Sequence, residues 1–220
     1  MLSLTNISKS FLQRGLVLDN LSLHVNRGDT IAIMGPSGSG KTTLMNIIGL
    51  LEKPDNGTLT FIGKDIGNYN DDESADYRSR NIGFVFQEHL LLPHLTVREN
   101  ILLPLLAIKQ DRHNNAIKEE HAANLMRRTG ILDISSKYPD TISGGEAQRA
   151  ALVRALVNNP SILIADEPTG SLDAHNADNM GELLAEMNRE FGITLILATH
   201  SEKLAGKMAR TMILGNGKLS

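Results

Sequence analysis

The sequence lacks several features that would point to particular classes of protein. It contains no cysteine, which rules out disulfide bonds and thiolate zinc sites and fits a reducing compartment. Its formal net charge is −3 and its pI is about 6.2. This balance gives no electrostatic case for nucleic acid as the main partner.

Long apolar segments are absent as well. The longest one, Ile101–Ile108, is too short to cross a bilayer, which takes about 20 helical residues. The first residues, Met1–Ile7, alternate between apolar and polar side chains, as a β-strand does and a signal peptide does not. We therefore expect a cytoplasmic protein that another protein must hold at any membrane where it works.

One glycine-rich stretch dominates what is present. Residues 35–42 read Gly-Pro-Ser-Gly-Ser-Gly-Lys-Thr, which matches the phosphate-binding P-loop pattern G-x-x-x-x-G-K-[ST]. The apolar run Asp29–Met34 precedes it, and apolar residues at helical spacing follow from Thr43 to Leu50. A strand, a glycine loop and a helix in this order are the context that the motif requires.

The residue types of this loop suit phosphate chemistry. Its glycines allow positive φ angles and a close approach to a ligand, so its N–H groups can form an anion nest at a helix N-terminus. We expect Lys41 to reach the β- and γ-phosphates of ATP and Thr42 to bind Mg²⁺. A turn without function is the weaker alternative. The predicted site comprises Gly35, Pro36, Ser37, Gly38, Ser39, Gly40, Lys41, Thr42 and Thr43.

Polar residues end three further apolar strands, at Gln87, at Asp166–Glu167 and at His200. Open α/β sheets bind ligands at the carboxyl ends of their strands. We expect Asp166 to hold Mg²⁺ as the Walker B aspartate and Glu167 to polarise an attacking water. Unpaired buried carboxylates are costly, so two in succession rarely serve packing. Gln87 either coordinates Mg²⁺ or positions a water, or it is a loop residue without a role.

Residues 88–158 have a different character, being rich in leucine and free of strand patterns. We predict an α/β fold in which this stretch forms a helical subdomain inserted into a P-loop NTPase core made of residues 1–87 and 159–220. The core would hold a mixed, mainly parallel sheet with flanking helices, and antiparallel strands at its N-terminus. The leucine clusters pack inside the subdomain or, as the sharper alternative, form a groove for a partner helix.

A second glycine-rich helix start lies within this stretch. Ser143 can cap the helix, and Glu146 three residues later completes a capping box, with Gly144 and Gly145 between them. Such a helix N-terminus is an anion site in principle. It can equally be a well-capped helix and nothing else, and the residues alone favour neither interpretation.

Together and in this order, these motifs resemble those of the ATP-binding cassette (ABC) ATPases, and the likeness covers almost the whole chain. The Ser-Gly-Gly signature at 143–145, between a glutamine loop and a Walker B strand, is highly specific to that family. The segments Asn81–Gln87, Leu91–Pro93 and Leu95–Asn100 are similar to its lipoprotein-releasing and macrolide-exporter branch.

The resemblance implies roles by position. Phe11, which by itself reads as ordinary strand packing, matches the aromatic residue that stacks on adenine. Gln87 matches the glutamine that couples Mg²⁺ and water to the membrane partner. Glu167 matches the general base of hydrolysis, and His200 matches the switch histidine that contacts the γ-phosphate.

The resemblance also implies contacts with a second copy. Ser143–Gly145 match the signature that caps the γ-phosphate of ATP bound to the other subunit, and Asp173 matches the aspartate at the dimer interface. Glu146 stands where glutamine is frequent, and Ile142 where leucine is commoner. Physics supports such a dimer, because a P-loop alone leaves the γ-phosphate open to water on one side.

A homodimer that closes on ATP binding is therefore expected. Its implied reaction is ATP + H₂O to ADP + phosphate with Mg²⁺, coupled to integral membrane permease subunits from another chain. The chain would lie at the inner face of the cell membrane and serve export or the handling of lipoprotein- or peptide-type substrates. A regulatory ABC ATPase that moves no cargo is the alternative, whereas small-molecule P-loop kinases share only residues 35–42.

Overall fold

The computed structural model describes residues 1–107 and 115–220, which divide into two compact units. The first unit comprises Met1–Ala75 and Ala185–Ser220, and the second comprises Asp76–Leu184. Ile108, at the end of the longest apolar stretch, lies outside the described residues. In the part of the chain that is described, no helix is long and apolar enough to cross a membrane. The subdomain limits 88 and 158 stay a prediction.

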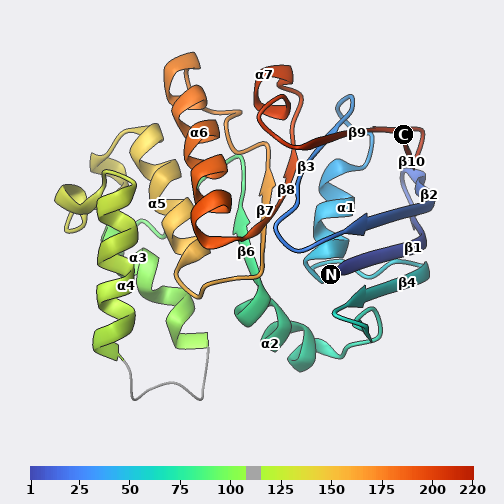
Figure 1. Cartoon of the computed structure of the whole chain (residues 1–220), viewed down its shortest axis with the longest axis horizontal. Helices are drawn as coiled ribbons and strands as arrows, with labels where there is room; N and C mark the ends of the chain where they lie inside the picture. The colour runs from blue at the N-terminus through green and yellow to red at the C-terminus, as the bar shows by residue number, and fades with distance from the viewer. Residues whose placement is uncertain (108–114) are drawn as a thin grey trace. The chain divides into compact units, whose positions relative to one another are not determined.

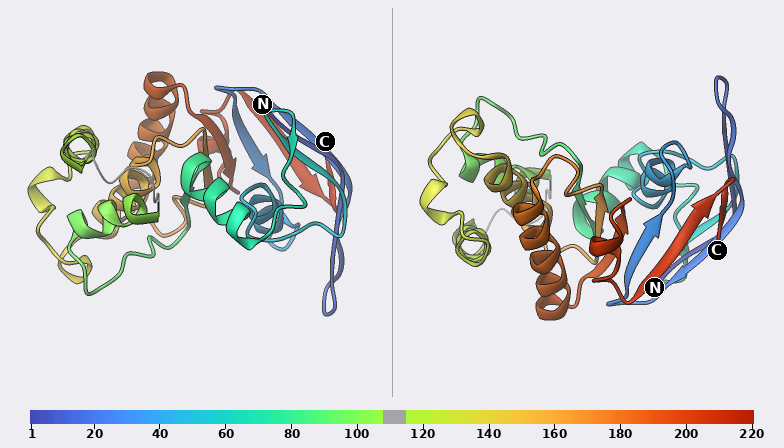
Figure 2. Two further views of the ribbon diagram at one scale, coloured as in Figure 1. Left: turned by 90° about the horizontal axis from the view of Figure 1, so that it is seen from below. Right: turned by 90° about the horizontal axis from the view of Figure 1, so that it is seen from above.

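The first unit contains an antiparallel sheet of four strands in the order β2-β1-β4-β5. Its members are β1 (Leu2–Phe11), β2 (Gly15–Val25), β4 (Asn56–Phe61) and β5 (Lys64–Asp65). The apolar alternation predicts strands at Leu2–Ile7 and Val17–Val25 with a turn between them. These strands are present as the hairpin of β1 and β2, and its tip extends beyond the neighbouring strands (Figure 2). Pairing continues as far as Phe11 and Gly15, so both strands are longer than their apolar alternation predicts.

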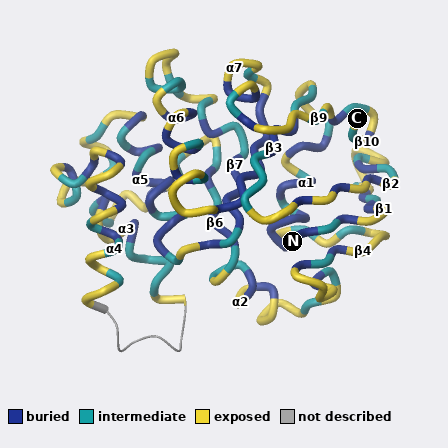
Figure 3. The backbone as a smooth tube through the Cα atoms, in the orientation of Figure 1, coloured by how far each residue is buried: buried dark blue, intermediate teal, exposed yellow. Residues whose placement is uncertain are grey.

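Parallel strands form the other layer of this unit. β3 (Thr30–Met34) pairs in parallel with both β8 (Thr194–Ala198) and β9 (Arg210–Gly215), and β10 (Lys218–Leu219) pairs antiparallel with β9 (Figure 1). All five residues of β8 and the middle of β3 are buried (Figure 3), as continuous apolar runs predict for parallel strands. Helix α1 (Lys41–Ile48) follows β3, and α7 (Glu202–Ala205) follows β8.

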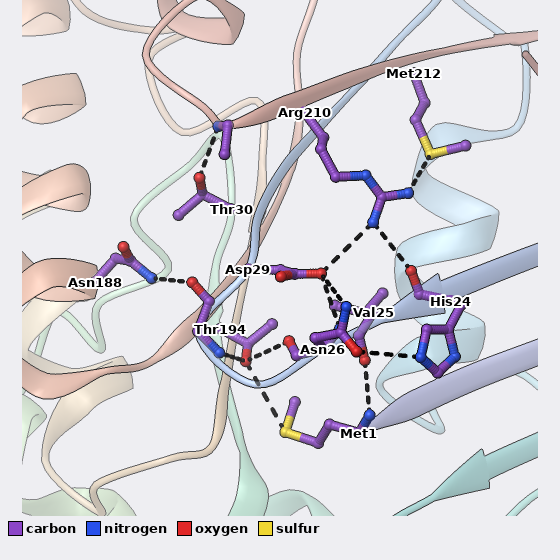
Figure 4. Close-up of polar contacts among 12 residues, drawn as sticks. Met1, His24, Val25, Asn26, Asp29, Thr30, Asn188, Thr194, Arg210 and Met212 are labelled. Carbon is purple, nitrogen blue, oxygen red and sulfur yellow. Dashed lines mark hydrogen bonds and ion pairs between the residues drawn. The ribbon is translucent and has the colours of Figure 1, made fainter.

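A polar cluster fixes the turn that leads into β3 (Figure 4). Asp29 pairs with Arg210 of β9 at 3.5 Å. The backbone N–H of Gly28 donates to Thr194 Oγ1 of β8 at 2.9 Å, and Asn188 Nδ2 donates to the Gly28 carbonyl at 3.0 Å. These bonds tie the start of β3 to both neighbouring strands, and the other end of β3 leads into the P-loop.

The second unit is built around the parallel pair β6 (Ile82–Val85) and β7 (Ile162–Asp166). No described residue between 88 and 158 is in a strand, as the leucine-rich composition predicts. Among its described residues this stretch forms the α-helices α3 (Val97–Leu102), α4 (Asn115–Arg128) and α5 (Gly144–Leu156). It also forms the 3-10 helices η1 (Leu103–Ala107), η3 (Leu132–Ile134) and η4 (Pro139–Thr141). The polar stretch Asn114–Arg128 predicts the helix α4, but its first residue, Asn114, lies outside the described residues.

Helices α2 (Asp71–Asn81) and α6 (Ala174–Phe191) complete the fold. The turn at Pro168–Asp173 predicts a helix that continues to about Phe191, as α6 does. The sequence does not predict α2, because residues 71–81 are mostly charged and lack an apolar periodicity. Acidic residues in the first turn of α2 and basic residues in its last turn instead suit the helix dipole. The sequence also predicts a helix over Ser201–Met208, but α7 is shorter and its C-cap is Gly206.

Helix α5 lies directly against β6. A Cβ atom on Gly83 would overlap the backbone carbonyl of Ala155 and would lie 3.2 Å from Leu163 Cδ1. The inner face of α5 carries small buried residues such as Ala147 and Ala151, which permit this close approach. The distance between β6 and α5 is therefore set by backbone contact.

Candidate functional site

The P-loop joins β3 to α1 and has the backbone conformation that its glycines predict. Gly38 and Gly40 have φ angles of +81° and +105°, in the left-handed region that favours glycine. Lys41 is buried, and its Nζ donates to the carbonyls of Gly35 at 2.8 Å and Pro36 at 3.2 Å. In this structure the lysine therefore binds the first residues of its own loop.

Two glycines of the loop are required by lack of space. A Cβ atom on Gly35 would overlap the Leu214 carbonyl of β9 and lie 2.8 Å from Ser39 Oγ. A Cβ atom on Gly40 would lie 2.9 Å from Val17 Cγ1 and 3.1 Å from Leu18 Cδ2 of β2. The loop is thus fixed against a strand of each sheet in the first unit.

The N-terminus of α1 is open to an anion. Its N-cap residue is Gly40, no side chain caps it, and its first turn holds no acidic residue. The first backbone N–H groups of a helix have no partner within the helix, and the helix dipole adds positive potential at this end. Thr42 lies in the same turn and is exposed.

The N-terminus of α5 is closed by contrast. Ser143 Oγ accepts from the Glu146 N–H at 3.3 Å, while the Glu146 carboxylate accepts from the Ser143 N–H at 2.8 Å and its hydroxyl at 2.7 Å. These hydrogen bonds hold the pKa of Glu146 below its usual value. The predicted capping box is therefore confirmed. Ser143 and Gly144 are exposed, and a Cβ atom on Gly144 would meet no neighbour.

Two further predicted residues belong to the first unit. Phe11 ends β1, is half-buried, and has Lys9 Nζ 5.3 Å from the centre of its ring. Lys9 also pairs with Glu52 at 2.6 Å and Asp55 at 3.3 Å. His200 is exposed, two residues beyond the end of β8. The structure thus puts the P-loop, Phe11 and His200 in one unit.

The Walker B segment belongs to the second unit. β7 is buried from Ile162 to Ala165, and half-buried Asp166 ends it as predicted. Glu167 has a φ angle of +49°, which is uncommon outside glycine and often marks functional sites. No sequence signal predicts this conformation, which turns the chain directly after the strand.

Gln87 is held from two sides within this unit. The carbonyl of Phe86 accepts from Gln148 Nε2 of α5 at 2.7 Å, and the carbonyl of Gln87 accepts from Ser171 Oγ at 3.0 Å. A Cβ atom on Gly170 would lie 3.0 Å from Gln87 Nε2. The sequence singles out Gln87 but not Gln148, because an amide within a helix carries no local signal of a distant partner.

Asp173 and the signature segment are linked by Asn176. The carboxylate of Asp173 accepts from the backbone N–H of Asn176 at 2.9 Å and from its Nδ2 at 2.6 Å, which lowers the pKa of Asp173. A Cβ atom on Gly145 would lie 2.7 Å from Asn176 Oδ1. Asn176, which sequence reasoning missed, therefore contacts both motifs.

The residues predicted to hold Mg²⁺ have suitable chemistry. Thr42, Gln87 and Asp166 offer a hydroxyl, an amide oxygen and a carboxylate, and Mg²⁺ prefers oxygen ligands. Within the residues that the structure describes, no cluster of three or more His, Asp and Glu side chains forms a metal site. A magnesium ion bound with nucleotide needs few protein ligands, because phosphates and water supply the rest.

A P-loop before an uncapped helix, followed along the chain by a buried strand that ends in two carboxylates, defines a P-loop nucleotide-binding protein. Comparison with known proteins narrows this class. The family model described as ABC transporter matches residues 18–170. The chain therefore belongs to the ABC transporter family, in which it is an ATP-binding and ATP-hydrolysing subunit.

Individual relatives agree with this membership. The chain is 42% identical over 223 residues to the lipoprotein-releasing system ATP-binding protein LolD of Myxococcus xanthus, covering 100% of this chain and 98% of the relative. It is 42% identical over 222 residues to the uncharacterized ABC transporter ATP-binding protein YvrO of Bacillus subtilis, covering 100% and 95%.

A solved structure has the same fold. The dimeric ATP-binding cassette MJ0796, in a post-hydrolysis state bound to ADP and Pi, matches with a TM-score of 0.91 at 35% identity. The match covers 100% of this chain and 97% of that one. The predicted fold class and the resemblance to ABC ATPases are both confirmed.

The capping box of α5 generates a prediction about pH. Because the folded-state pKa of Glu146 is depressed, its carboxylate stabilises the fold above its unfolded pKa of about 4.3 and loses this effect as pH falls through the folded value. Glu146→Gln should lower the free energy of unfolding at pH 7 by about 0.5 kcal/mol, an exposed charge–dipole effect.

Urea unfolding from pH 7 to pH 3.5 measures the difference in the free energy of unfolding between the wild-type protein and Glu146→Gln. We expect the difference in the free energy of unfolding to stay constant down to about pH 5 and to shrink as pH falls further through the folded-state pKa of Glu146. In a Ser143→Ala background, which removes the hydroxyl donor, the difference should be smaller at every pH. A difference that does not change with pH would contradict the assignment.

Proposed function

We propose that this chain is the ATPase subunit of a lipoprotein-releasing or closely related export complex. It binds ATP with Mg²⁺, closes as a homodimer and drives a conformational change in an integral membrane permease from another chain. The permease holds it on the cytoplasmic side of the cell membrane. Support comes from the full-length similarity, at 42% identity, to a lipoprotein-releasing ATP-binding protein.

One structural observation carries the nucleotide-binding part of the proposal. Helix α1 presents backbone N–H groups that no side chain caps, directly after a loop in which Gly38 and Gly40 have positive φ angles. Residues 35–43 would bind the phosphates of ATP through these groups and through Lys41. On binding, the ammonium group would exchange the carbonyls of Gly35 and Pro36 for phosphate oxygens, which carry more charge.

Hydrolysis would use groups from the carboxyl ends of the strands. Glu167 would accept a proton from the water that attacks the γ-phosphorus, while the bond to the β-phosphate oxygen breaks and ADP leaves. His200 would contact the γ-phosphate, and Phe11 would stack on adenine. Mg²⁺, held by Thr42, Gln87 and Asp166, would neutralise charge on the phosphates.

A second copy would complete the site. The Ser143–Gly145 segment at the start of α5, of which Ser143 and Gly144 are exposed, would cap the γ-phosphate bound to the other subunit, with Glu146 and Asp173 at the same interface. This would exclude water and add a second positive helix end to the developing charge. Since ATP would contact both chains, its binding would favour the closed dimer.

The helical subdomain predicted at 88–158 would transmit this closure to the permease. Leu91 and Ile101 are buried within it, as packing predicts, but Leu90 and Leu106 are 52% and 80% exposed. Exposed leucines on a soluble subunit support an apolar surface for a partner. The sharper interpretation of the leucine-rich composition thus gains support at these positions.

Replacing the proposed base tests the catalytic assignment. Glu167→Gln keeps the size of the side chain but cannot accept a proton, so phosphate release should fall by about 10²–10⁴-fold. ATP binding, measured by equilibrium titration, should stay within about threefold of wild type. Glu120→Gln, an exposed position on α4, should hydrolyse normally. Near-normal turnover in Glu167→Gln would disprove the role of Glu167.

The partner is tested by purification of tagged Glu167→Gln from gently solubilised membranes with ATP and Mg²⁺. We expect one dominant integral membrane protein with few spans and a large external domain, which Lys41→Ala should capture less well. A stable ATP-dependent dimer with no membrane protein would contradict the export complex and leave a soluble regulatory ATPase.

A further inference from the structure

We propose that Gln148 is a positioning residue that links the start of α5 to Gln87, and through this link makes hydrolysis at one ATP respond to the other. The inference rests on the proposed roles of Gln87 and of Ser143–Gly145. Gln148 is 1% exposed, and its Nε2 donates to the carbonyl of Phe86 at 2.7 Å. That carbonyl belongs to the peptide unit that continues into Gln87.

Packing alone does not call for an amide at this position. The neighbouring residues on the inner face of α5, such as Ala147 and Ala151, are buried and apolar, and methionine has nearly the same shape as glutamine. A buried amide costs free energy unless it is hydrogen-bonded. Gln148 therefore fixes one particular carbonyl, which an apolar residue would leave without this donor.

The backbone on the far side of Gln87 is held by the same helix. Arg154 donates to the carbonyl of His89 at 2.8 Å and to that of Leu90 at 2.6 Å. Helix α5 cannot slide freely over β6, because Gly83 already brings the two backbones into contact. Residues 86–90 are thus fastened to α5 at both ends, with Gln87 between the fastenings.

A second connection reaches Gln87 from the segment around Asp173. Ser171 Oγ donates to the Gln87 carbonyl at 3.0 Å. Asn176 bonds to Asp173 and lies against Gly145. Both segments that are proposed to meet the second copy are therefore connected by hydrogen bonds to Gln87 or to its neighbour Phe86.

These contacts connect α5 to both ATP molecules of the proposed dimer, so each of them would affect the position of this helix. Gln148 lies one turn further along the helix from Ser143–Gly145. When these residues meet the γ-phosphate on the second copy, a shift of the first turn of α5 would move Gln148 and with it the Phe86 carbonyl. Gln87 would then move relative to the Mg²⁺ and water that it is proposed to hold. The two ATP sites of the dimer are thereby coupled through hydrogen-bonded contacts.

A double-mutant cycle of ATP hydrolysis tests this link. Gln148→Met removes the donor and keeps the packing, so kcat should fall by about 10- to 100-fold through misplacement of Gln87, with the Kd for ATP within about threefold. In a Gln87→Ala background the same change should have almost no further effect, because both act through one side chain. Gln148→Asn, which keeps an amide but shortens its reach, should lower kcat in the same direction and serves if Gln148→Met does not fold.

The matched control is Asn158→Leu. Asn158 is also an amide near the end of α5 that donates to backbone carbonyls, those of Ser79 at 3.1 Å and Pro104 at 3.0 Å. These carbonyls lie outside residues 86–90, so any effect of Asn158→Leu on kcat should add fully to that of Gln87→Ala.

Two results would overturn the proposal in different ways. Additive losses for Gln148→Met and Gln87→Ala, with Gln87→Ala itself impaired, would remove the link and leave the function of Gln87 standing. Normal hydrolysis by Gln87→Ala would remove the role of Gln87, and this inference with it.

Discussion

The backbone of the P-loop can face a phosphate only because glycines let it lie in contact with strands on both sides. Gly35 leaves no space for a side chain beside β9, and Gly40 leaves none beside β2. The polar cluster around Asp29 and Gly28 holds the start of β3 to β8 and β9, so the strand that leads into the loop is fixed as well. An anion site formed by a rigid backbone needs little reorganisation on binding, which is the basis of strong electrostatic binding and catalysis.

The chain has two glycine-rich helix starts, and they differ in charge. The start of α1 has no cap and no acid in its first turn, whereas the start of α5 is satisfied by Ser143 and Glu146. In this structure the Ser143 hydroxyl donates to a carboxylate. To reach a γ-phosphate it would have to turn away from Glu146, so α5 is suited to bind a phosphate only when another copy brings one close. This difference fits one permanent phosphate site and one conditional contact in each chain.

The motifs that could be predicted from the sequence are those with local causes. Glycine and lysine spacing defines the P-loop, the Ser143–Glu146 spacing defines a capping box, and an apolar run defines β7 before its carboxylates. Gln148 and Asn176 could not be predicted, because their importance depends on residues far along the chain, such as Phe86. Helix α2 lacks an apolar periodicity, and the φ angle of Glu167 leaves no trace in composition. The role proposed for Phe11 rests on the family resemblance alone, since the sequence around Phe11 indicates only ordinary strand packing.

The central claim is that the P-loop of one copy and the Ser143–Gly145 segment of another enclose one ATP, and cysteine cross-linking tests it most directly. The chain has no cysteine of its own, so Ser37→Cys and Gly144→Cys, both at exposed positions, can each be introduced alone into Glu167→Gln. With ATP, Mg²⁺ and a short bifunctional thiol reagent, a dimer of this geometry should be cross-linked only when the two variants are mixed. Equal cross-linking within either variant alone, or none in a mixture that dimerises with ATP, would contradict it.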